Sequence, residues 1–209
     1  AKKGSKGRYG VGLPRTSDGS LLFLMHMISK MKETESGSRI AVIFNGSPLY
    51  TGGANDSKNE NTIRQWIIKN NWLEAIVALP RHLFFNTDIQ TYIWILTNKK
   101  SKKRKGKIQL INAESFFDEL NKNVGKKGRE ISLSQIEKIT KIYHEFKEGE
   151  FAHIFDDDEF GYTLITVERP LRRNFKINNE RLERLQETKN FKKLSLSKNL
   201  SKNPKPADL

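Results

Sequence analysis

Two adjacent phenylalanines lie in the middle of a long apolar segment of the sequence. The segment LPRHLFFNTDIQTYIWILTNKK, residues 79–100, places Phe84, Phe85 and Asn86 between two apolar runs. One ring of such a pair packs into the core, but its neighbour cannot easily do the same from the adjacent position. An exposed ring can stack on a nucleobase that has left its duplex, which restores roughly 1–3 kcal/mol of lost stacking energy. The pair therefore predicts a binding site for an extruded base.

A basic run follows the same segment. The sequence KKSKKRKGK, residues 99–107, lies between two predicted strands, so we expect it to form a hairpin tip. A solvated turn and a contact with nucleic-acid phosphates explain its charge about equally well. The second interpretation uses Lys99, Lys100, Lys102, Lys103, Arg104 and Lys105. The whole chain carries a net charge of +14 over 209 residues, which favours a polyanionic partner.

Other kinds of chemistry have less support. The chain has no cysteine, which excludes disulfides, zinc fingers and thiol nucleophiles. Its four histidines lie far apart, and we assign no metal site to them. A run of four acids could hold Mg²⁺, but consecutive acids point in different directions, which favours a solvated surface role. This acidic cluster consists of Asp156, Asp157, Asp158 and Glu159.

The sequence also bears on where the protein works. No stretch approaches the ~20 consecutive apolar residues of a membrane span, and the N-terminal AKKGSKGRYG lacks the apolar core of a signal peptide. We therefore expect a soluble, cytoplasmic protein that does not bind membranes. The chain begins at Ala1 rather than at Met, so we expect it to be a portion of a longer protein.

Strands and helices alternate along the first two thirds of the chain, which predicts an α/β layered sheet. The predicted strands are residues 39–45, 74–80, 91–99 and 107–113. The predicted helices are residues 20–32, 57–71 with a Ser57/Glu60 cap, and 131–146 with a Ser134/Glu137 cap. Residues 47–56 are predicted to be a loop, and residues 160–175 an extended segment before a helix near 178–188.

Several long blocks of the sequence strongly resemble a known family. They are GRYGVGLPRTSDGSLLFLMHMISKMK, SRIAVIFNGSPLYTGG, IRQWIIKNNWLEAIVALPRHLFFNTDIQTYIWILTNKK and IFDDDEFGYTLITVERPLRRNF. Together they are similar to the modification (M) subunit of type I restriction-modification systems, an N6-adenine DNA methyltransferase. The resemblance extends from about residue 4 to residue 186.

The resemblance implies a fold and a division of the chain. The expected fold is α/β, the C-terminal part of a doubly wound, Rossmann-like methyltransferase sheet with a helical C-terminal extension. Residues 1–113 are expected to form the C-terminal half of the methyltransferase domain. Residues 114–190 are expected to form a mostly helical extension with a short strand, and residues 191–209 a basic, flexible tail.

The resemblance also implies roles for particular residues. Phe84 is expected to stack on the flipped adenine, with Phe85 as the second choice and Asn86 shaping the pocket. The strand and loop that contain Asn45, Gly46 and Pro48 are expected to border that pocket. Asp88 is a departure, because relatives commonly have glycine there and an acid would repel phosphate. Either the loop differs in geometry or Asp88 points away from DNA.

Two motifs of the family are absent from the chain. Relatives use an Asn-Pro-Pro-aromatic motif at the adenine amine, and a glycine-bearing loop for S-adenosylmethionine. None of the prolines in this chain is paired. We therefore expect the full-length subunit to methylate adenine N6 in DNA with S-adenosylmethionine, and expect this portion alone to be inactive and without cofactor.

The expected partners are DNA and the specificity (S) and restriction (R) subunits of a type I complex. A sheet that has lost its other half exposes an edge strand and apolar faces, which a homodimer is one way to cover. The alternative hypothesis is a non-catalytic nucleic-acid-binding or assembly module that uses the same basic surface.

Overall fold

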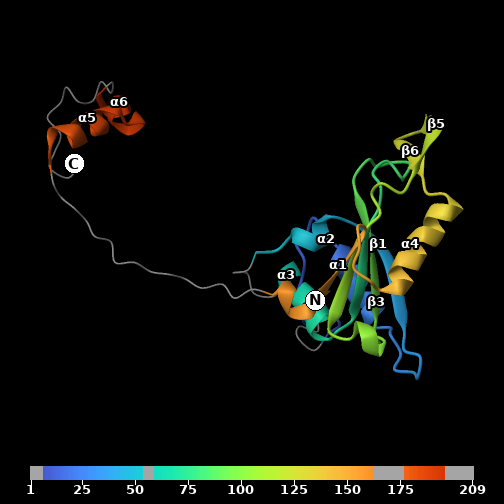
Figure 1. The fold of residues 1–209 in the computed structure, drawn as a ribbon. Coiled ribbons are helices and arrows are strands. Elements are labelled where there is room, and N and C mark those ends of the chain that lie inside the picture. Colours follow the sequence, from blue (N-terminus) through green and yellow to red (C-terminus); the bar gives the residue numbers. More distant parts are fainter. Residues whose placement is uncertain (1–6, 54–58, 162–176, 196–209) are drawn as a thin grey trace. The chain divides into compact units, whose positions relative to one another are not determined.

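The computed structural model describes residues 7–53, 59–161 and 177–195 (Figure 1). The chain divides into two units, Ala1–Leu164 and Ile165–Leu209. In the second unit, α5 (Asn179–Glu187) and α6 (Lys189–Ser195) are described, and α5 confirms the helix predicted near residues 178–188. The segment predicted to be extended lies mostly outside the described residues, as does most of the predicted basic tail.

The first unit is built on a mixed five-stranded sheet with the order β1-β3-β2-β4-β7. Strand β3 is antiparallel to both β1 and β2, β2 is parallel to β4, and β4 is antiparallel to β7. The strands are β1 (Arg39–Asn45), β2 (Leu73–Ala78), β3 (Thr91–Thr97), β4 (Lys107–Asn112) and β7 (Ala152–Asp156). Because β1, β2 and β4 run in the same direction, their last residues lie at one edge of the sheet. We call the edge with Asn45, Ala78 and Asn112 the carboxyl edge, and the opposite edge the amino edge.

Helices cover both faces of this sheet. On one face α1 (Ser20–Ile28) and α3 (Glu60–Lys69) pack against the sheet through a shared apolar core. On the other face α4 (Leu133–Glu145) contributes Ile139, Ile142 and Tyr143 to a second core. The alternation of side chains along each strand supplies both cores, since Ile76 belongs to the first and Val77 to the second. The predicted α/β class is confirmed.

The helix starts differ from the predicted caps. Asn59 caps α3, because its side chain accepts hydrogen bonds from the backbone N–H groups of Asn61 and Thr62. Ser57, the predicted cap, lies outside the described residues. For α4 the predicted Ser134/Glu137 cap is wrong by two residues, because Ser132 forms the capping box with Gln135.

Short elements of the structure were not predicted from the sequence. Helix α2 (Ser47–Tyr50) lies within the predicted loop, and β7 joins the main sheet as its last strand. A separate two-stranded sheet consists of β5 (Asp118–Val124) and β6 (Lys127–Glu130), joined by a turn at Gly125 and Lys126. We call this element the hairpin, and Figure 1 shows it beyond the ends of the main strands.

The basic run is not a hairpin tip, and this prediction is wrong. Strands β3 and β4 are not neighbours, because β2 lies between them in the sheet. Residues 99–107 therefore cross the amino edge from one side of β2 to the other, through the 3-10 helix η2 (Lys102–Arg104). We call residues 99–107 the basic crossover. Within the described ranges, every helix is too short or too polar to cross a lipid bilayer.

Candidate functional site

The carboxyl edge gathers the loops that follow β1, β2 and β4. Asn45 at the end of β1 is in register with Thr91 at the start of β3, so the β1 loop adjoins the segment that precedes β3. We call that segment, residues 79–90, the aromatic loop. In open α/β sheets ligands bind at the carboxyl ends of the parallel strands, so this edge is the natural place for a site. The structure thus places Asn45, Gly46 and Pro48 at the same edge of the sheet as the aromatic loop.

The aromatic loop is tied to the sheet at both ends. The Gln90 side-chain amide donates to the carbonyl of Leu79 at 3.5 Å, and also donates to the Glu114 carboxylate beyond β4. The Arg81 guanidinium donates to the carbonyl of Asp88 at 3.2 Å, which closes the loop across its base. His82 has a left-handed backbone with φ of 60°, an unfavourable conformation for a residue with a Cβ. The loop is therefore held in a particular shape.

The two phenylalanines of the loop differ in exposure. Phe85 is 57% exposed, Phe84 is half-buried, and Asn86 is exposed. The exposure of Phe85 agrees with the argument that both rings of an adjacent pair cannot pack inward. Phe84, however, belongs to neither apolar core, and Leu83 packs against the second core instead. The sequence interpretation preferred Phe84 as the stacking ring, whereas the exposed fraction favours Phe85. Which ring contacts a base stays a prediction.

The hairpin supports the aromatic loop through main-chain hydrogen bonds. The N–H of Lys126 donates to the carbonyl of Phe85 at 2.8 Å. The N–H groups of Gly128 and Arg129 donate to the carbonyl of His82 at 3.0 and 3.2 Å. Gly125, with φ of 63°, allows this approach, because a Cβ there would lie 2.6 Å from the Phe85 carbonyl oxygen.

The hairpin also places positive charge beside the exposed ring. The Lys127 ammonium lies 5.2 Å from the centroid of the Phe85 ring. The sequence analysis missed this contact, because residues 118–130 are mostly polar and lack the apolar alternation of a strand. The available signal was Gly125 followed by Lys126, which form a two-residue hairpin turn between Val124 and Lys127.

The hairpin explains the unexpected acid in the aromatic loop. The Asp88 carboxylate lies 3.8 Å from the Lys126 ammonium. A hydrogen bond from its own backbone N–H, together with the charge of Lys126, holds the pKa of Asp88 below its usual value. Asp88 is therefore ionised at neutral pH, and a cation of the hairpin offsets its charge. The loop carries the acid without presenting an uncompensated negative charge.

The loop after β1 is well ordered by its own contacts. The Asn45 side chain accepts a hydrogen bond from the N–H of Ser47 at 3.1 Å, and Gly46 precedes α2. A Cβ at Gly46 would lie 3.1 Å from the Tyr50 ring, so the protein itself fills that space. Pro48 is buried, and its carbonyl accepts a hydrogen bond from the Arg64 guanidinium at 3.0 Å. These residues shape a border and do not form a cradle for a nucleoside.

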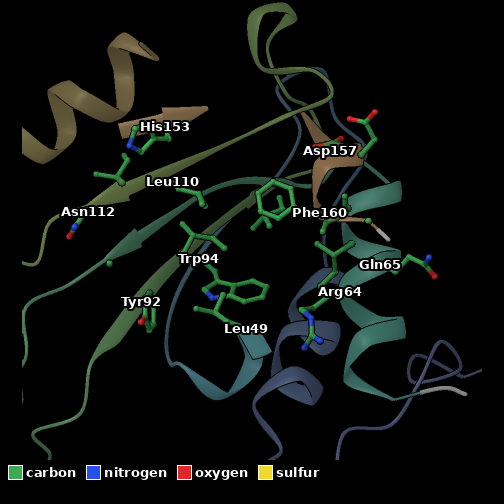
Figure 2. Close-up of a pocket in the computed structure, with 18 of the residues that line it drawn as sticks. Leu49, Arg64, Gln65, Tyr92, Trp94, Leu110, Asn112, His153, Asp157 and Phe160 are labelled. Carbon is green, nitrogen blue, oxygen red and sulfur yellow. The ribbon is translucent and has the colours of Figure 1, made fainter. Parts of the chain in front are cut away.

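A cleft of about 1160 Å³ begins at this edge and runs along the α3 face of the sheet (Figure 2). Arg64 and Gln65 line it from α3, while Tyr92, Trp94 and Leu110 line it from the strands. Burial raises the pKa of Tyr92, and the nearby Glu114 carboxylate and Tyr50 add to the effect. The buried Trp94 indole nitrogen has no hydrogen-bond partner among the described residues. The lining is largely apolar, and nothing in the described part of the chain indicates which molecule or segment covers it.

The amino edge contains a buried ionic network. The Arg104 guanidinium lies between the rings of Tyr143 and Phe146, at 4.4 and 4.3 Å from their centroids. Its Nε lies 3.4 Å from the Glu74 carboxylate, which also accepts a hydrogen bond from the Tyr143 hydroxyl at 2.9 Å. Burial and this hydrogen bond raise the pKa of Tyr143 to about 12. Arg39 adds a second ion pair to Glu74 at 3.2 Å.

The six cations predicted to contact phosphate have different surroundings. Arg104 is only 4% exposed, and the Lys100 side chain is only 1% exposed. Lys100 donates to the carbonyl of Lys107 at 2.7 Å, and burial lowers its pKa. Lys99 and Lys103 donate to the carbonyls of Glu35 and His144. Lys102 and Lys105 are exposed. Much of the charge of the crossover is therefore used within the protein.

The aromatic loop and the basic crossover lie at opposite edges. They flank the two ends of β3, whose seven residues span roughly 20 Å at ~3.3 Å per residue. The structure therefore does not bring Phe84 and Phe85 together with the basic run that follows them in the sequence.

The acidic cluster has local structural roles. Asp156 ends β7 and caps the 3-10 helix η3 (Asp157–Phe160), and its N–H donates to the Glu159 carboxylate at 2.8 Å. Asp156 also pairs with Lys107, and Asp157 lies 4.0 Å from Lys100. The described residues contain no group of three or more histidines and acids suited to hold a metal ion. Through these two ion pairs the acidic cluster joins the end of β7 to the basic crossover.

Comparison with known proteins places this geometry in context. The sequence matches the model of the family described as N-6 DNA Methylase over residues 1–189. The type I restriction enzyme MjaVIII methylase subunit of Methanocaldococcus jannaschii is 32% identical over 152 residues, which cover 72% of this chain and 24% of that protein. The type I restriction enzyme HindI methylase subunit of Haemophilus influenzae is 34% identical over 109 residues, which cover 52% of this chain and 23% of that protein.

A solved structure shares the fold. The methyltransferase subunit of a type I restriction-modification system from Streptococcus thermophilus superposes with a TM-score of 0.57 and 27% sequence identity. The superposition covers 68% of this chain and 28% of that subunit. The chain thus spans about a quarter of the length of the relatives it matches.

Proposed function

Because the chain belongs to the N-6 DNA methylase family, we propose that it forms part of the methylase subunit of a type I restriction-modification system. The family resemblance inferred from the sequence is confirmed by the match over residues 1–189. In the proposed reaction the complete subunit transfers a methyl group from S-adenosylmethionine to N6 of adenine in DNA. Residues 1–113 would form the C-terminal half of its doubly wound domain. Residues 114–190 would form an extension that adds β7 to the same sheet, and residues 191–209 a basic tail.

The proposed contribution of this chain is the surface against which the flipped adenine stacks. The observation that supports it is a phenylalanine, Phe85, that is 57% exposed at the carboxyl edge although its backbone is fixed by the hairpin. An aromatic face offered to an extruded base is worth roughly 1–3 kcal/mol. Asn86 lies beside it, and Asn45, Gly46 and Pro48 border the same edge. A ring held in place before the base arrives costs little ordering entropy on binding.

The chemical step needs groups beyond those described. The loop at Gly46 does not fit S-adenosylmethionine, since the Tyr50 ring fills the space beside Gly46. The chain also lacks the Asn-Pro-Pro-aromatic motif that the family uses at the adenine amine. We therefore derive no step through that cofactor. The specificity and restriction subunits are the proposed protein partners. Sequence-specific reading of DNA would belong to the specificity subunit.

Substitution of the exposed ring tests the stacking role. In the complete methylase subunit, assembled with its partner, Phe85→Ala is expected to lower kcat/KM for adenine methylation by roughly 5- to 150-fold, which corresponds to the lost stacking. Phe85→Tyr keeps an aromatic face and should retain most activity. The matched control is Phe23→Ala on α1, because Phe23 is also exposed, at 71%, and lies away from the loop.

The result also decides between the two rings. Loss of activity in Phe84→Ala but not in Phe85→Ala would transfer the role to Phe84. Unchanged methylation in both variants would remove the aromatic loop from base recognition.

A second candidate function is a non-catalytic nucleic-acid-binding or assembly module. It is favoured by the net charge of +14 over the 209 residues, which suits a nucleic-acid partner without any catalytic group. The two proposals are separated by the genomic DNA upstream of the coding sequence. An in-frame segment encoding Asn-Pro-Pro-Phe or Asn-Pro-Pro-Tyr supports the methylase, and a start codon directly before this sequence supports the module.

A further inference from the structure

We propose that the hairpin holds the DNA phosphates that flank the extruded nucleotide, beside the stacking ring. This inference rests on the proposed function, because it concerns the same bound nucleotide. A base leaves the duplex by rotation about its own backbone, so its flanking phosphates stay close to the pocket that receives it. Cations next to the stacking ring are therefore placed to meet those phosphates.

The charge of the hairpin suits such a contact. The hairpin contains four cations and three acids, and the acids, Asp118, Glu119 and Glu130, lie at its open end away from the turn. The part around the turn, residues 120–129 (LNKNVGKKGR), contains the four cations and no acid. Lys122 and Lys126 are exposed, and Lys127 lies over the Phe85 ring at 5.2 Å. Arg129 is less available, because its side chain is only 29% exposed and its guanidinium lies 3.8 Å from the Phe117 ring centroid. The Lys126 side chain is 60% exposed, so a phosphate can replace Asp88 as its partner at small cost. Three lysines therefore remain as candidates for phosphate contact.

The position of these lysines relative to the ring is fixed. Three main-chain hydrogen bonds join the hairpin to His82 and Phe85, so the cations and the ring belong to one structural unit. The side chain of Lys126 lies 3.8 Å from Asp88, which keeps its ammonium near the aromatic loop. A phosphate that enters this region meets lysine ammonium groups next to the exposed Phe85 ring.

The basic crossover is less suited to this role. It lies at the other edge of the sheet, roughly 20 Å from the aromatic loop at ~3.3 Å per residue of β3. Its Arg104 and Lys100 side chains are buried. Its exposed Lys102 and Lys105 could attract DNA at long range, but they cannot reach the phosphates next to a base stacked on Phe85.

The test compares two triple variants with the same change in charge. The first, Lys122→Gln/Lys126→Gln/Lys127→Gln, neutralises the hairpin. The control, Lys30→Gln/Lys32→Gln/Lys69→Gln, neutralises three exposed lysines elsewhere in the same unit. Both are placed in the complete methylase subunit assembled with its specificity partner. The affinity for a duplex with 2-aminopurine at the target adenine is then measured by fluorescence anisotropy across a series of salt concentrations.

The expected outcome is a change in salt dependence confined to the hairpin variant. Each lost phosphate contact lowers the slope of log Kd against log salt by roughly 0.9, so three contacts lower it by about 2.7 for each bound copy of the chain. The control should keep the wild-type slope. A third variant, Lys122→Arg/Lys126→Arg/Lys127→Arg, preserves charge and should restore the slope, which separates lost charge from a misfolded hairpin.

The remaining outcomes distinguish this inference from the proposed function. Equal slopes for the wild type and the hairpin variant would overturn the inference, even if Phe85→Ala abolishes methylation and the stacking role stands. A reduced slope in the hairpin variant, with normal methylation in Phe84→Ala and Phe85→Ala, would support the phosphate contact and reject the stacking role. An equal loss of slope in the control variant would show a general charge effect and overturn the inference.

Discussion

The amino edge and the carboxyl edge of the sheet contain similar side chains in opposite circumstances. At the amino edge, Arg104 is enclosed between two aromatic rings and paired with the buried Glu74. At the carboxyl edge, Lys127 lies over Phe85, and the ring is 57% exposed. Both edges combine a cation with an aromatic ring. Only at the carboxyl edge is one face of the ring left for another molecule.

This difference teaches that basic and aromatic composition does not by itself identify a binding surface. The charges of the amino edge have their partners inside the protein, so they stabilise the fold. The charges of the carboxyl edge have at most exposed partners, which a ligand can displace at small cost. Substitutions at the two edges should therefore affect different quantities.

The largest effect is expected at Glu74. Replacement of Glu74 by alanine leaves Arg104 buried without its carboxylate and removes the acceptor of the Tyr143 hydroxyl. Loss of one partner of a buried ion pair costs about 3–5 kcal/mol in the free energy of unfolding, which urea denaturation measures. Glu119→Ala at the hairpin, which breaks the exposed pair with Arg129, should cost less than about 1 kcal/mol. Equal losses would contradict the contrast between the edges.

The next largest effect on stability is expected for Tyr143→Phe, and it should depend on pH in the alkaline range. Tyr143→Phe removes a hydrogen bond to a buried carboxylate, which should cost about 1.5–3 kcal/mol near neutral pH. The pKa of Tyr143 is raised from its usual 10.0 to about 12, so its stabilising contribution is complete below pH 10 and is lost as the pH rises to 12. The melting temperature of the wild type should therefore fall more steeply over this interval than that of the variant. Tyr50→Phe, at a tyrosine that is 75% exposed, should reproduce the wild-type curve.

Two glycines with left-handed backbones allow a matched comparison of the edges. Gly125 in the hairpin and Gly106 in the basic crossover have φ of 63° and 71°, so alanine strains both by about 1 kcal/mol. A Cβ at Gly106 meets no atom within 4 Å, whereas one at Gly125 would lie 2.6 Å from the Phe85 carbonyl oxygen. Gly125→Ala should therefore cost about 1 kcal/mol more than Gly106→Ala in thermal unfolding.

Hydrogen exchange localises that effect. The Lys126 amide should lose protection in Gly125→Ala and keep it in Gly106→Ala, because its acceptor is the Phe85 carbonyl. Full protection of Lys126 in Gly125→Ala would show that the hairpin does not depend on the close approach.

The smallest effect is expected at Asp88. Its pair with Lys126 is exposed, so Asp88→Asn should leave the free energy of unfolding nearly unchanged. Removal of the acid should tighten DNA binding by about two- to threefold at low salt, and less at high salt. Because the pKa of Asp88 is lowered, the acid is ionised throughout pH 5–8, and the gain should not vary over that range. Weaker DNA binding in this variant would show that Asp88 orders the loop for its ligand.

The sequence predicted the parts of the fold that local patterns encode. Strands β1 and β3 are rich in β-branched residues, which favour strands, and both were placed correctly. Burial does not explain the pattern of β1, because β1 is an edge strand and only its Phe44 is buried. Strand β7, AHIFD, mixes polar and apolar residues and is defined by its pairing with β4. The hairpin is defined by its contact with the aromatic loop. Patterns along one segment contain no information on such partners.

The candidate site shows the same limit. The adjacency of Phe84 and Phe85 was enough to predict that one ring stays exposed, as Phe85 does, but not that Phe84 is only half-buried and belongs to neither core. The sequence did not predict that Arg104 is buried while Lys102 is exposed. The reason is Glu74, the ion-pair partner of Arg104, which is distant in the sequence and adjacent in space. The sequence also did not predict that residues 99–107 cross the amino edge, because this depends on the strand order, in which β2 separates β3 from β4. Charge is readable from a sequence, but the partner of each charge is not.

The support of the aromatic loop has a consequence for how this surface can change over generations. Amide hydrogens and carbonyl oxygens of the main chain join the hairpin to His82 and Phe85. Such bonds tolerate almost any side chain, apart from the small residue that the turn needs at Gly125. Natural variation can therefore change the number of lysines in the hairpin while the Phe85 backbone keeps its position. The proposed contact with phosphate can therefore change independently of the proposed stacking ring.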